Sequence, residues 1–413
     1  MLCSRDRATN TRQNASWATS SGSVAPISAV RRTPPRTSHP SYAWAARWLP
    51  RHDTMAAMPP AQPVLDLSAD VVAVTAALVD IESVSRNEAA IADAVEAALR
   101  PLSHLHVERS GNTVTARTSL GRAERVAIAG HLDTVPVNAN LPSRLEGDTL
   151  HGLGSCDMKG GVAVGLRLAA SVPEPTRDVT YIFYECEEIE AVANGLGHLA
   201  ATRPDLLEAD FAILMEPSNG AVEAGCQGTM RVDVMVRGER AHSARWWMGV
   251  NAIHAVAPVL ERLVGYEPRT PTIDGLTYRE GLNAIGVSGG VAGNVLPDEC
   301  RVSVNYRFAP DRDERQALAH LEAVFDGFDL ELADSAPGAM PGLDRPAAAA
   351  FVAAVQGDVH PKFGWTDVAL FTSLGVPAVN FGPGDPSLAH TRGESVPIAQ
   401  LRNCEATLRR WLS

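Results

Sequence analysis

Three short apolar segments of the chain each end in histidine or acidic residues, and this pattern constrains the fold more than any other feature. The segments read RVAIAGHLD, DVTYIFYECEE and FAILMEPS, and they start at residues 125, 178 and 211. Helical stretches such as GGVAVGLRLAASV separate them, as expected for strands of an α/β sheet with helices on both faces. In an open sheet of this kind, ligands bind at the carboxyl ends of the strands. We therefore expect a site where the three segments end.

The pattern changes near residue 228 and changes back near residue 338. Between them, TMRVDVMVRGE alternates apolar and polar residues and begins a β-α-β-β-α order typical of a ferredoxin-like α+β sandwich. We predict a discontinuous α/β catalytic domain, formed by residues 58–227 and 339–413, with an inserted lid or dimerisation domain over residues 228–338. Residues 1–57 show no helical or alternating period, and we expect a disordered extension or a mis-assigned start.

The charge of the chain argues against nucleic acid and membranes as partners. The formal net charge is −12, and residues 1–54, with eight arginines and two aspartates, contribute +6, which leaves −18 for the other 359 residues. An acidic body repels phosphate backbones and anionic lipids, and no apolar run approaches the ~18 residues of a membrane helix. The six cysteines show no CxxC pair, which is typical of reduced thiols in a cytoplasmic protein.

Several histidine and acidic residues lie at the ends of predicted elements, where a metal site could form. These residues are His131, Asp133, Asp157, Glu187, Glu188, Glu216 and His390. Taken singly, each has an ordinary structural role, such as a helix cap for Asp157. Together, two histidines, a bridging aspartate and two glutamates suit two divalent cations, and a further glutamate can take a proton from water. Asp133 would then orient the ring of His131.

Six short motifs occur in the order found in one family of hydrolases. They are GHLDTVP, GLGSCDMKGG, ECEE, EPS, RGERAHSA and AHTRGE, which begin at residues 130, 152, 185, 216, 237 and 389. With these motifs, residues 65–413 resemble the M20 family of metal-dependent amidohydrolases and peptidases. The resemblance implies a zinc-peptidase-like catalytic domain, a lid through which the protein forms a homodimer, and two zinc ions per subunit, with cobalt or manganese as substitutes.

The resemblance also implies which residues bind the two ions. His131, Glu216 and Asp157 would hold one zinc ion. Glu188, His390 and Asp157 would hold the other, so that the carboxylate of Asp157 bridges the pair.

Five further residues receive roles from the same resemblance. Asp133 and Glu187 would be catalytic, with Glu187 as the general base. From the lid, His242 would help to stabilise an oxyanion, and Asn294 and Arg307 would contact the substrate. The chain departs from the family at two places. Cys186 replaces an aspartate before the glutamate pair, and the segment GCQGTM, which begins at residue 225, lacks the basic residues that many members carry there.

The activity implied by the resemblance is hydrolysis of the amide bond of an N-acylated amino acid. The stretches AHSARWWMGVNAIHA, GLNAIGVSGGVAGNVLPDEC and VNYRFAP most resemble members that split N-succinyl-LL-2,6-diaminopimelate into succinate and LL-2,6-diaminopimelate, a step of lysine biosynthesis. Deacetylation of acetylornithine and carboxypeptidase-type hydrolysis are alternatives within the family. An inactive metal-binding protein is an alternative of another class, although the presence of Glu187 speaks against it.

Overall fold

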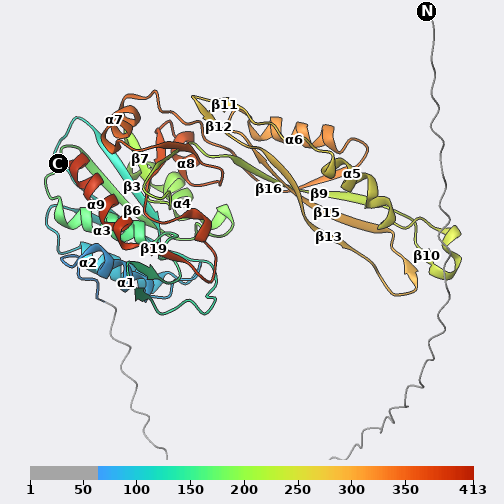
Figure 1. Ribbon diagram of the computed structural model, residues 1–413, viewed down its shortest axis with the longest axis horizontal. Coiled ribbons are helices and arrows are strands. Elements are labelled where there is room, and N and C mark those ends of the chain that lie inside the picture. Colours follow the sequence, from blue (N-terminus) through green and yellow to red (C-terminus); the bar gives the residue numbers. More distant parts are fainter. Residues whose placement is uncertain (1–63) are drawn as a thin grey trace, which may run out of the picture. The chain divides into compact units, whose positions relative to one another are not determined.

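The computed structural model describes residues 64–413, and the larger sheet within this range has eight strands (Figure 1). In order across the sheet they are β1 (His106–Ser110), β2 (Thr113–Arg117), β6 (Asp178–Tyr184), β3 (Arg125–His131), β7 (Phe211–Leu214), β18 (Ala378–Asn380), β8 (Val222–Ala224) and β17 (Val359–Pro361). The central strands β6, β3, β7 and β18 are parallel, so their carboxyl ends lie at one edge.

Alternating side chains of β3 explain why helices cover both faces of this sheet. Val126 and Ile128 belong to one hydrophobic core, and Ala127 and Ala129 to another. The first core also contains side chains of α1 (Val71–Val79), α2 (Ala89–Leu99), α3 (Lys159–Ser171), α7 (Pro346–Val355) and α9 (Ile398–Leu412). The second contains side chains of α4 (Gly195–Thr202) and α8 (Val368–Ser373). The α/β architecture predicted from the sequence is confirmed.

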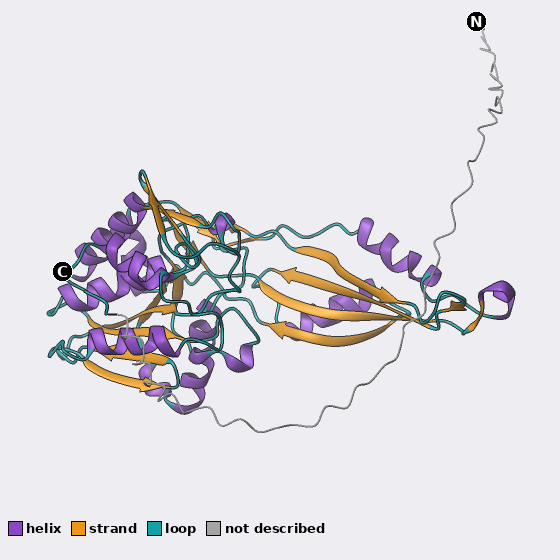
Figure 2. Cartoon of the chain, turned by 90° about the horizontal axis from the view of Figure 1, so that it is seen from below, coloured by secondary structure: helices purple, strands orange, loops and turns teal. Residues whose placement is uncertain are grey.

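A second sheet of four antiparallel strands is formed by the inserted segment (Figure 2). Its order is β13 (Gly281–Gly289), β15 (Glu299–Phe308), β9 (Gly228–Arg237) and β16 (Asp329–Ala336). Helices α5 (Ala257–Val264) and α6 (Glu314–Val324) share one core with the sheet, in which Val232 and Val304 are fully buried with Val259 and Leu321. The chain order β9-α5-β13-β15-α6-β16 is that of a ferredoxin-like sandwich, as expected.

Two details of this inserted segment differ from the expectation. We expected a helix from residue 249, but the α-helix begins only at Ala257. Pro258 has no backbone N–H to donate to a preceding helical turn, so it can lie only in the first turn of an α-helix. A short 3-10 helix precedes it. The final strand β16 was not expected, because a register shift between Leu332 and Asp334 interrupts its apolar alternation.

The chain enters and leaves the four-stranded sheet through a pair of hydrogen-bonded segments. Cys226, just before β9, and Ala339, after β16, donate N–H groups to each other's carbonyl oxygens at 3.0 Å. The indole of Trp365 donates to the carbonyl oxygen of Pro337 at 3.1 Å. These bonds fix the start of β9 and the end of β16 against the segment that precedes α8.

The remaining elements are short. They are β4 (Arg144–Glu146), β5 (Thr149–His151) and β19 (Ser395–Pro397) in one small sheet, the pair β10 (Ala241–His242) and β14 (Val295–Leu296), the pair β11 (Thr272–Ile273) and β12 (Leu276–Thr277), and the 3-10 helices η1 (Ala191–Ala193), η2 (Pro204–Leu206), η3 (Ser243–Met248), η4 (His254–Val256) and η5 (Pro386–Leu388). Among residues 64–413, no helix has the length and apolar character needed to cross a bilayer. The expectation for residues 1–57 lies outside the described residues.

Candidate metal centre and active site

Four of the expected site residues lie at or just after the carboxyl ends of neighbouring parallel strands. His131 is the last residue of β3, Glu187 and Glu188 follow β6, and Glu216 follows β7. Because the three strands are adjacent in the order β6-β3-β7, their ends bring these side chains to one edge of the sheet. This is the edge at which open α/β sheets bind ligands.

Asp157 comes from the turn before α3, and the close packing of α3 brings that turn to the same edge. A side chain at Gly161 would place its Cβ only 2.1 Å from the backbone oxygen of Met215, so glycine is required for this approach. The turn itself is held by the buried carboxylate of Glu394. This group accepts hydrogen bonds from the N–H groups of Cys156 at 3.1 Å and Asp157 at 3.0 Å.

The carboxylate of Asp157 lies between two histidines. Its Oδ1 is 3.2 Å from Nε2 of His131, and its Oδ2 is 3.4 Å from Nε2 of His390. The same nitrogen of His390 is 3.0 Å from Glu188. Ligand atoms of His131, Asp157 and Glu216 lie within 4.8 Å of one another, as do those of Asp157, Glu188 and His390. These two groups contain the same residues as the two ligand sets that the family resemblance implies, and that they bind metal stays a prediction.

The electrostatics of this cluster suit divalent cations. Oε1 of Glu216 is buried and has no hydrogen-bond partner among the described residues. Burial, together with the charge of Asp157, raises the pKa of Glu216 to about 8. Hydrogen bonds to Asp157 and Glu188 raise the pKa of His390 to about 10. The carboxylates of the cluster outnumber its two imidazoles, and bound cations would neutralise this excess of negative charge.

Asp133 connects a candidate metal ligand to the loop that carries the two glutamates. This fully buried residue places Oδ1 at 3.4 Å from Nδ1 of His131. Its carboxylate accepts hydrogen bonds from the N–H groups of Glu187 at 3.0 Å and Glu188 at 3.1 Å, and from the hydroxyl of Ser85 at 2.7 Å. Nδ1 of His131 is also 3.1 Å from the backbone oxygen of Asp133. Asp133 thus orients the imidazole through both groups, and its carboxylate fixes the start of the loop.

Glu187 stands beside the ligand cluster rather than between the two histidines. Its carboxylate lies within 4.8 Å of ligand atoms of His131 and Glu188. Burial raises its pKa well above the ordinary value, which makes it a proton acceptor whose basicity depends on nearby positive charge. It also lines two cavities, one of about 340 Å³ shared with the ligands and one of about 810 Å³ that extends toward β9 and β15.

The three residues expected to act from the lid are not all near this cluster. Arg307 lines the larger cavity together with Glu187. His242 and Asn294 line neither cavity. They are instead close to each other, because Ser243 donates its N–H to the carbonyl oxygen of Asn294 at 2.9 Å. Within one chain, the structure therefore unites Arg307 with the candidate metal centre but leaves His242 and Asn294 apart from it.

Both lysines of the chain are buried near the candidate centre, although neither was expected to be a site residue. Lys159 donates to the carbonyl oxygen of Ile81 at 2.7 Å. Lys362 lies 2.7 Å from Glu223 and donates to the carbonyl oxygen of Pro217 at 3.3 Å, on the wall of the smaller cavity. Lysine is otherwise absent from the chain, and Lys159 lies within the motif GLGSCDMKGG, so the sequence did distinguish Lys159. No motif indicates Lys362. Glu394 was also missed, although it ends the motif AHTRGE.

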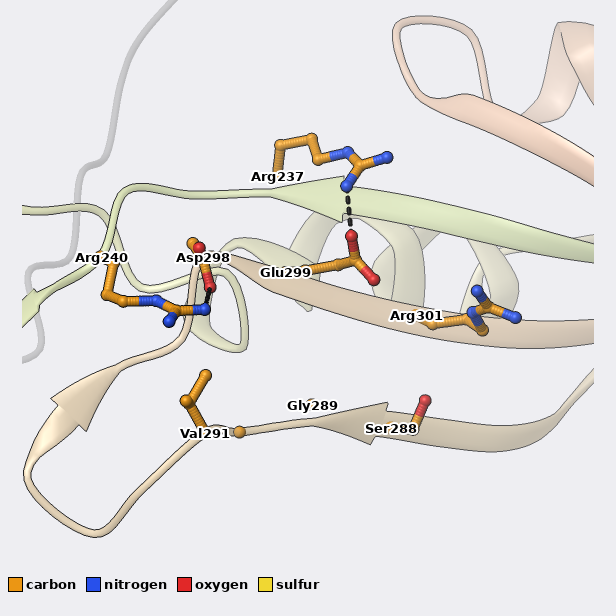
Figure 3. A pocket seen from close by; sticks show the side chains of 9 residues that line it. Arg237, Arg240, Ser288, Gly289, Val291, Asp298, Glu299 and Arg301 are labelled. Carbon is orange, nitrogen blue, oxygen red and sulfur yellow. Dashed lines mark hydrogen bonds and ion pairs between the residues drawn. The ribbon is translucent and has the colours of Figure 1, made fainter.

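A separate cavity of about 600 Å³ lies in the inserted segment (Figure 3). Arg237 forms an ion pair with Glu299, and Arg240 pairs with Asp298 at 2.8 Å. The positive charges that line this cavity are thus neutralised by neighbouring carboxylates. None of the expected site residues lines it, and we assign it no role.

The fold and the candidate centre define a class of hydrolase, and the comparisons with known proteins agree. Residues 127–413 match the model of the peptidase family M20/M25/M40. The chain therefore belongs to this family of metal-dependent hydrolases.

Individual proteins extend the similarity over nearly the whole described chain. DapE of Mycobacterium tuberculosis is 58% identical over 352 residues, which are 84% of this chain and 99% of that protein. Succinyl-diaminopimelate desuccinylase of Corynebacterium glutamicum is 46% identical over 85% of this chain and 98% of its own length. Among solved structures, a tripeptidase of Staphylococcus aureus superposes with a TM-score of 0.69 at 21% identity, over 84% of this chain and 98% of that one.

Proposed function

We propose that this protein hydrolyses the amide bond of N-succinyl-LL-2,6-diaminopimelate and releases succinate and LL-2,6-diaminopimelate. The observation that carries this proposal is the carboxylate of Asp157 between His131 and His390, with the carboxylate of Glu187 beside them. The choice of substrate is supported by 46% identity, over nearly full length, to the Corynebacterium glutamicum protein that bears the name of this activity.

Two zinc ions, for which cobalt or manganese can substitute, suit the ligand sets described above. When bound, they would polarise the amide carbonyl and lower the pKa of a water molecule. Glu187 accepts the proton of the attacking water and returns it to the leaving nitrogen. Asp133 keeps the imidazole of His131 and the backbone of Glu187 in fixed positions during this proton transfer. Arg307, in the same cavity as Glu187, binds a carboxylate of the substrate through its planar guanidinium group.

We further propose a homodimer through the inserted segment, in which His242 and Asn294 reach the site of the partner subunit. The strand β13 is an edge of its sheet, and its side chains Ile285 and Val287 are 58% and 57% exposed. An apolar edge strand of this kind favours pairing with a second copy. The isolated position of His242 within one chain is consistent with action in trans. A cytoplasmic location fits the five cysteines of residues 64–413, all of which are free.

A substrate panel assayed with zinc-loaded protein tests the proposed function. It contains N-succinyl-LL-2,6-diaminopimelate, N-acetylornithine and a dipeptide, and release of each amine is measured. We expect kcat/KM to be highest for the succinylated compound. A preference for acetylornithine or for the dipeptide would replace the proposed substrate with one of the alternatives. No turnover of any compound by fully loaded protein would favour metal binding without catalysis.

A further inference from the structure

The larger cavity beside the candidate metal centre has two walls of opposite character. One wall contains Glu187, Glu188 and Glu190 from the loop after β6, and Glu190 forms an ion pair with Arg86. The other contains Arg231 and Arg307, from the neighbouring strands β9 and β15. Arg307 is among the residues expected to contact the substrate, whereas Arg231 was not expected at the site.

The alternation of β9 directs Arg231 away from the core and toward this cavity. Met230 and Val232 are buried in the core of the inserted segment, so the side chain between them lies on the opposite face of the sheet. In the pairing of β9 with β15, Arg231 is opposite Asn305, and Thr229 is opposite Arg307. The two arginines are therefore diagonal neighbours on one face, a spacing that long side chains can span.

Neither guanidinium group forms an ion pair with a carboxylate of residues 64–413. Arg301 lies on the same face of β15 and provides a contrast, because its guanidinium is 3.0 Å from the carboxylate of Asp233. The sheet wall of the cavity does contain Asp334, which is opposite Arg231 in the pairing of β9 with β16. Two arginines facing one aspartate leave an excess positive charge on this wall, which suits an anionic group of a ligand.

We infer that Arg231 binds the free carboxylate of the acyl group of the substrate, and that it thereby determines specificity for a dicarboxylic acyl group. This inference rests on the proposed function. The segment GCQGTM, which directly precedes Arg231, contains no basic residue. Arg231 is the arginine of β9 that lines the larger cavity. The succinyl carboxylate is separated from the cleaved bond by two methylene groups. A guanidinium on the cavity wall opposite Glu187 is suitably placed to bind a group beyond the reacting amide.

The test uses two substrates that differ only in this carboxylate. N-succinyl-LL-2,6-diaminopimelate is compared with its succinamoyl analogue, in which a neutral amide replaces the terminal carboxylate. We expect the zinc-loaded wild-type protein to prefer the succinyl compound in kcat/KM. In Arg231→Gln this preference should fall by about 10- to 100-fold, the range for loss of a hydrogen bond to a charged group. Arg231→Lys should recover part of the preference, because the charge is kept and the planar fork is lost.

Arg301→Gln is the control, since Arg301 lies on the same face of the sheet, outside the larger cavity, and is ion-paired with Asp233. It should keep the wild-type preference. The inhibition constant of free succinate provides a second readout, and it should rise in Arg231→Gln but not in Arg301→Gln. If Arg231→Gln lowers turnover of both substrates equally, or leaves the preference intact, the role of Arg231 is wrong although the desuccinylase activity stands. If the wild-type protein hydrolyses neither substrate, the proposed function itself is wrong.

Discussion

Oδ1 of Asp133 accepts a hydrogen bond of 3.0 Å from the backbone N–H of Glu187, while the same atom lies 3.4 Å from the imidazole of His131. One buried carboxylate thus aligns a candidate metal ligand with the candidate base. We predict that Asp133→Ala lowers zinc affinity by about 10-fold, the lower end of the effect of losing a partner of a ligating histidine, because the backbone oxygen of residue 133 stays 3.1 Å from the imidazole. Titration against a competing chelator measures this affinity.

The hydroxyl of Ser85 offers a control, because it donates to the same carboxylate and, among the described residues, forms no hydrogen bond with a candidate ligand. Ser85→Ala should retain an affinity close to that of the wild type. Equal losses in the two variants would mean that Asp133 acts through general packing and not through His131.

Substitutions of the two adjacent glutamates are predicted to have different effects on turnover and on metal binding. Glu187→Ala should still bind two zinc ions but lose turnover by ~10² or more, the contribution expected of a general base. Glu188→Ala should bind less metal, because Glu188 is 3.0 Å from His390 in a ligand cluster. Elemental analysis with steady-state kinetics distinguishes the two. The opposite pattern would reverse the assignment of base and ligand.

Metal removal should abolish activity, and zinc should restore it. Among single ligand substitutions, Asp157→Ala should cause the largest loss of bound zinc, because its two oxygens face His131 and His390 separately. His131→Ala and His390→Ala serve as comparisons, each expected to weaken mainly one site. Full turnover by protein shown to be metal-free would refute the metal dependence.

His242 is predicted to act on the site of the partner subunit. Glu187→Ala and His242→Ala, each inactive alone, are unfolded together and refolded into mixed dimers. If His242 acts on the partner's site, a mixed dimer contains one site with both Glu187 and His242 and one site with neither. Up to half of the wild-type activity per mixed dimer should then return. If His242 acts in its own chain, every site lacks one group. Dimers proven mixed by mass but inactive would therefore exclude the trans arrangement.

The buried Lys159 should make stability depend on pH in the alkaline range. Burial lowers its pKa from 10.5 to about 7 in the folded chain. Between pH 7 and pH 10.5, Lys159 is protonated in the unfolded chain and mostly neutral in the folded chain. Unfolding therefore takes up a proton, and the contribution of this group to the free energy of unfolding rises with pH. The Tm of the wild type relative to Lys159→Met should therefore increase from pH 7 toward pH 10. A difference that stays constant, or shrinks, over this range contradicts the prediction.

The sequence predicts which residues come together at the candidate metal centre, because these residues follow strand ends or lie in motifs. That they bind metal stays a prediction. His131 and Glu216 adjoin apolar runs, so the strand pattern alone predicts their common edge. The position of His390 could not be predicted in this way, since it lies in a loop with a φ of 62°. No strand or helix periodicity there indicates where its side chain points. Only its motif connected it with Asp157.

Other features depended on contacts that the sequence does not encode locally. Glu394 reaches the turn of Asp157 across 237 positions of the chain, and nothing in its neighbourhood indicates that partner. Arg231 follows an ordinary strand alternation, which predicts the face of its side chain but not what lies opposite. The strand β16 was missed because its register shift breaks the pattern on which strand prediction depends.

The antiparallel pairing of Cys226 with Ala339 has a consequence for how this protein could have been assembled. Residues in such a bridge lie about 5.5 Å apart, a gap that a two-residue hairpin turn can close. The whole segment from 227 to 338 is therefore an insertion, whose two ends are joined by one antiparallel β-bridge between Cys226 and Ala339. Its replacement by a short turn would leave every strand of the eight-stranded sheet connected in its present order, so in chain connectivity the cavity wall that contains Arg231 and Arg307 is separable from the candidate metal centre.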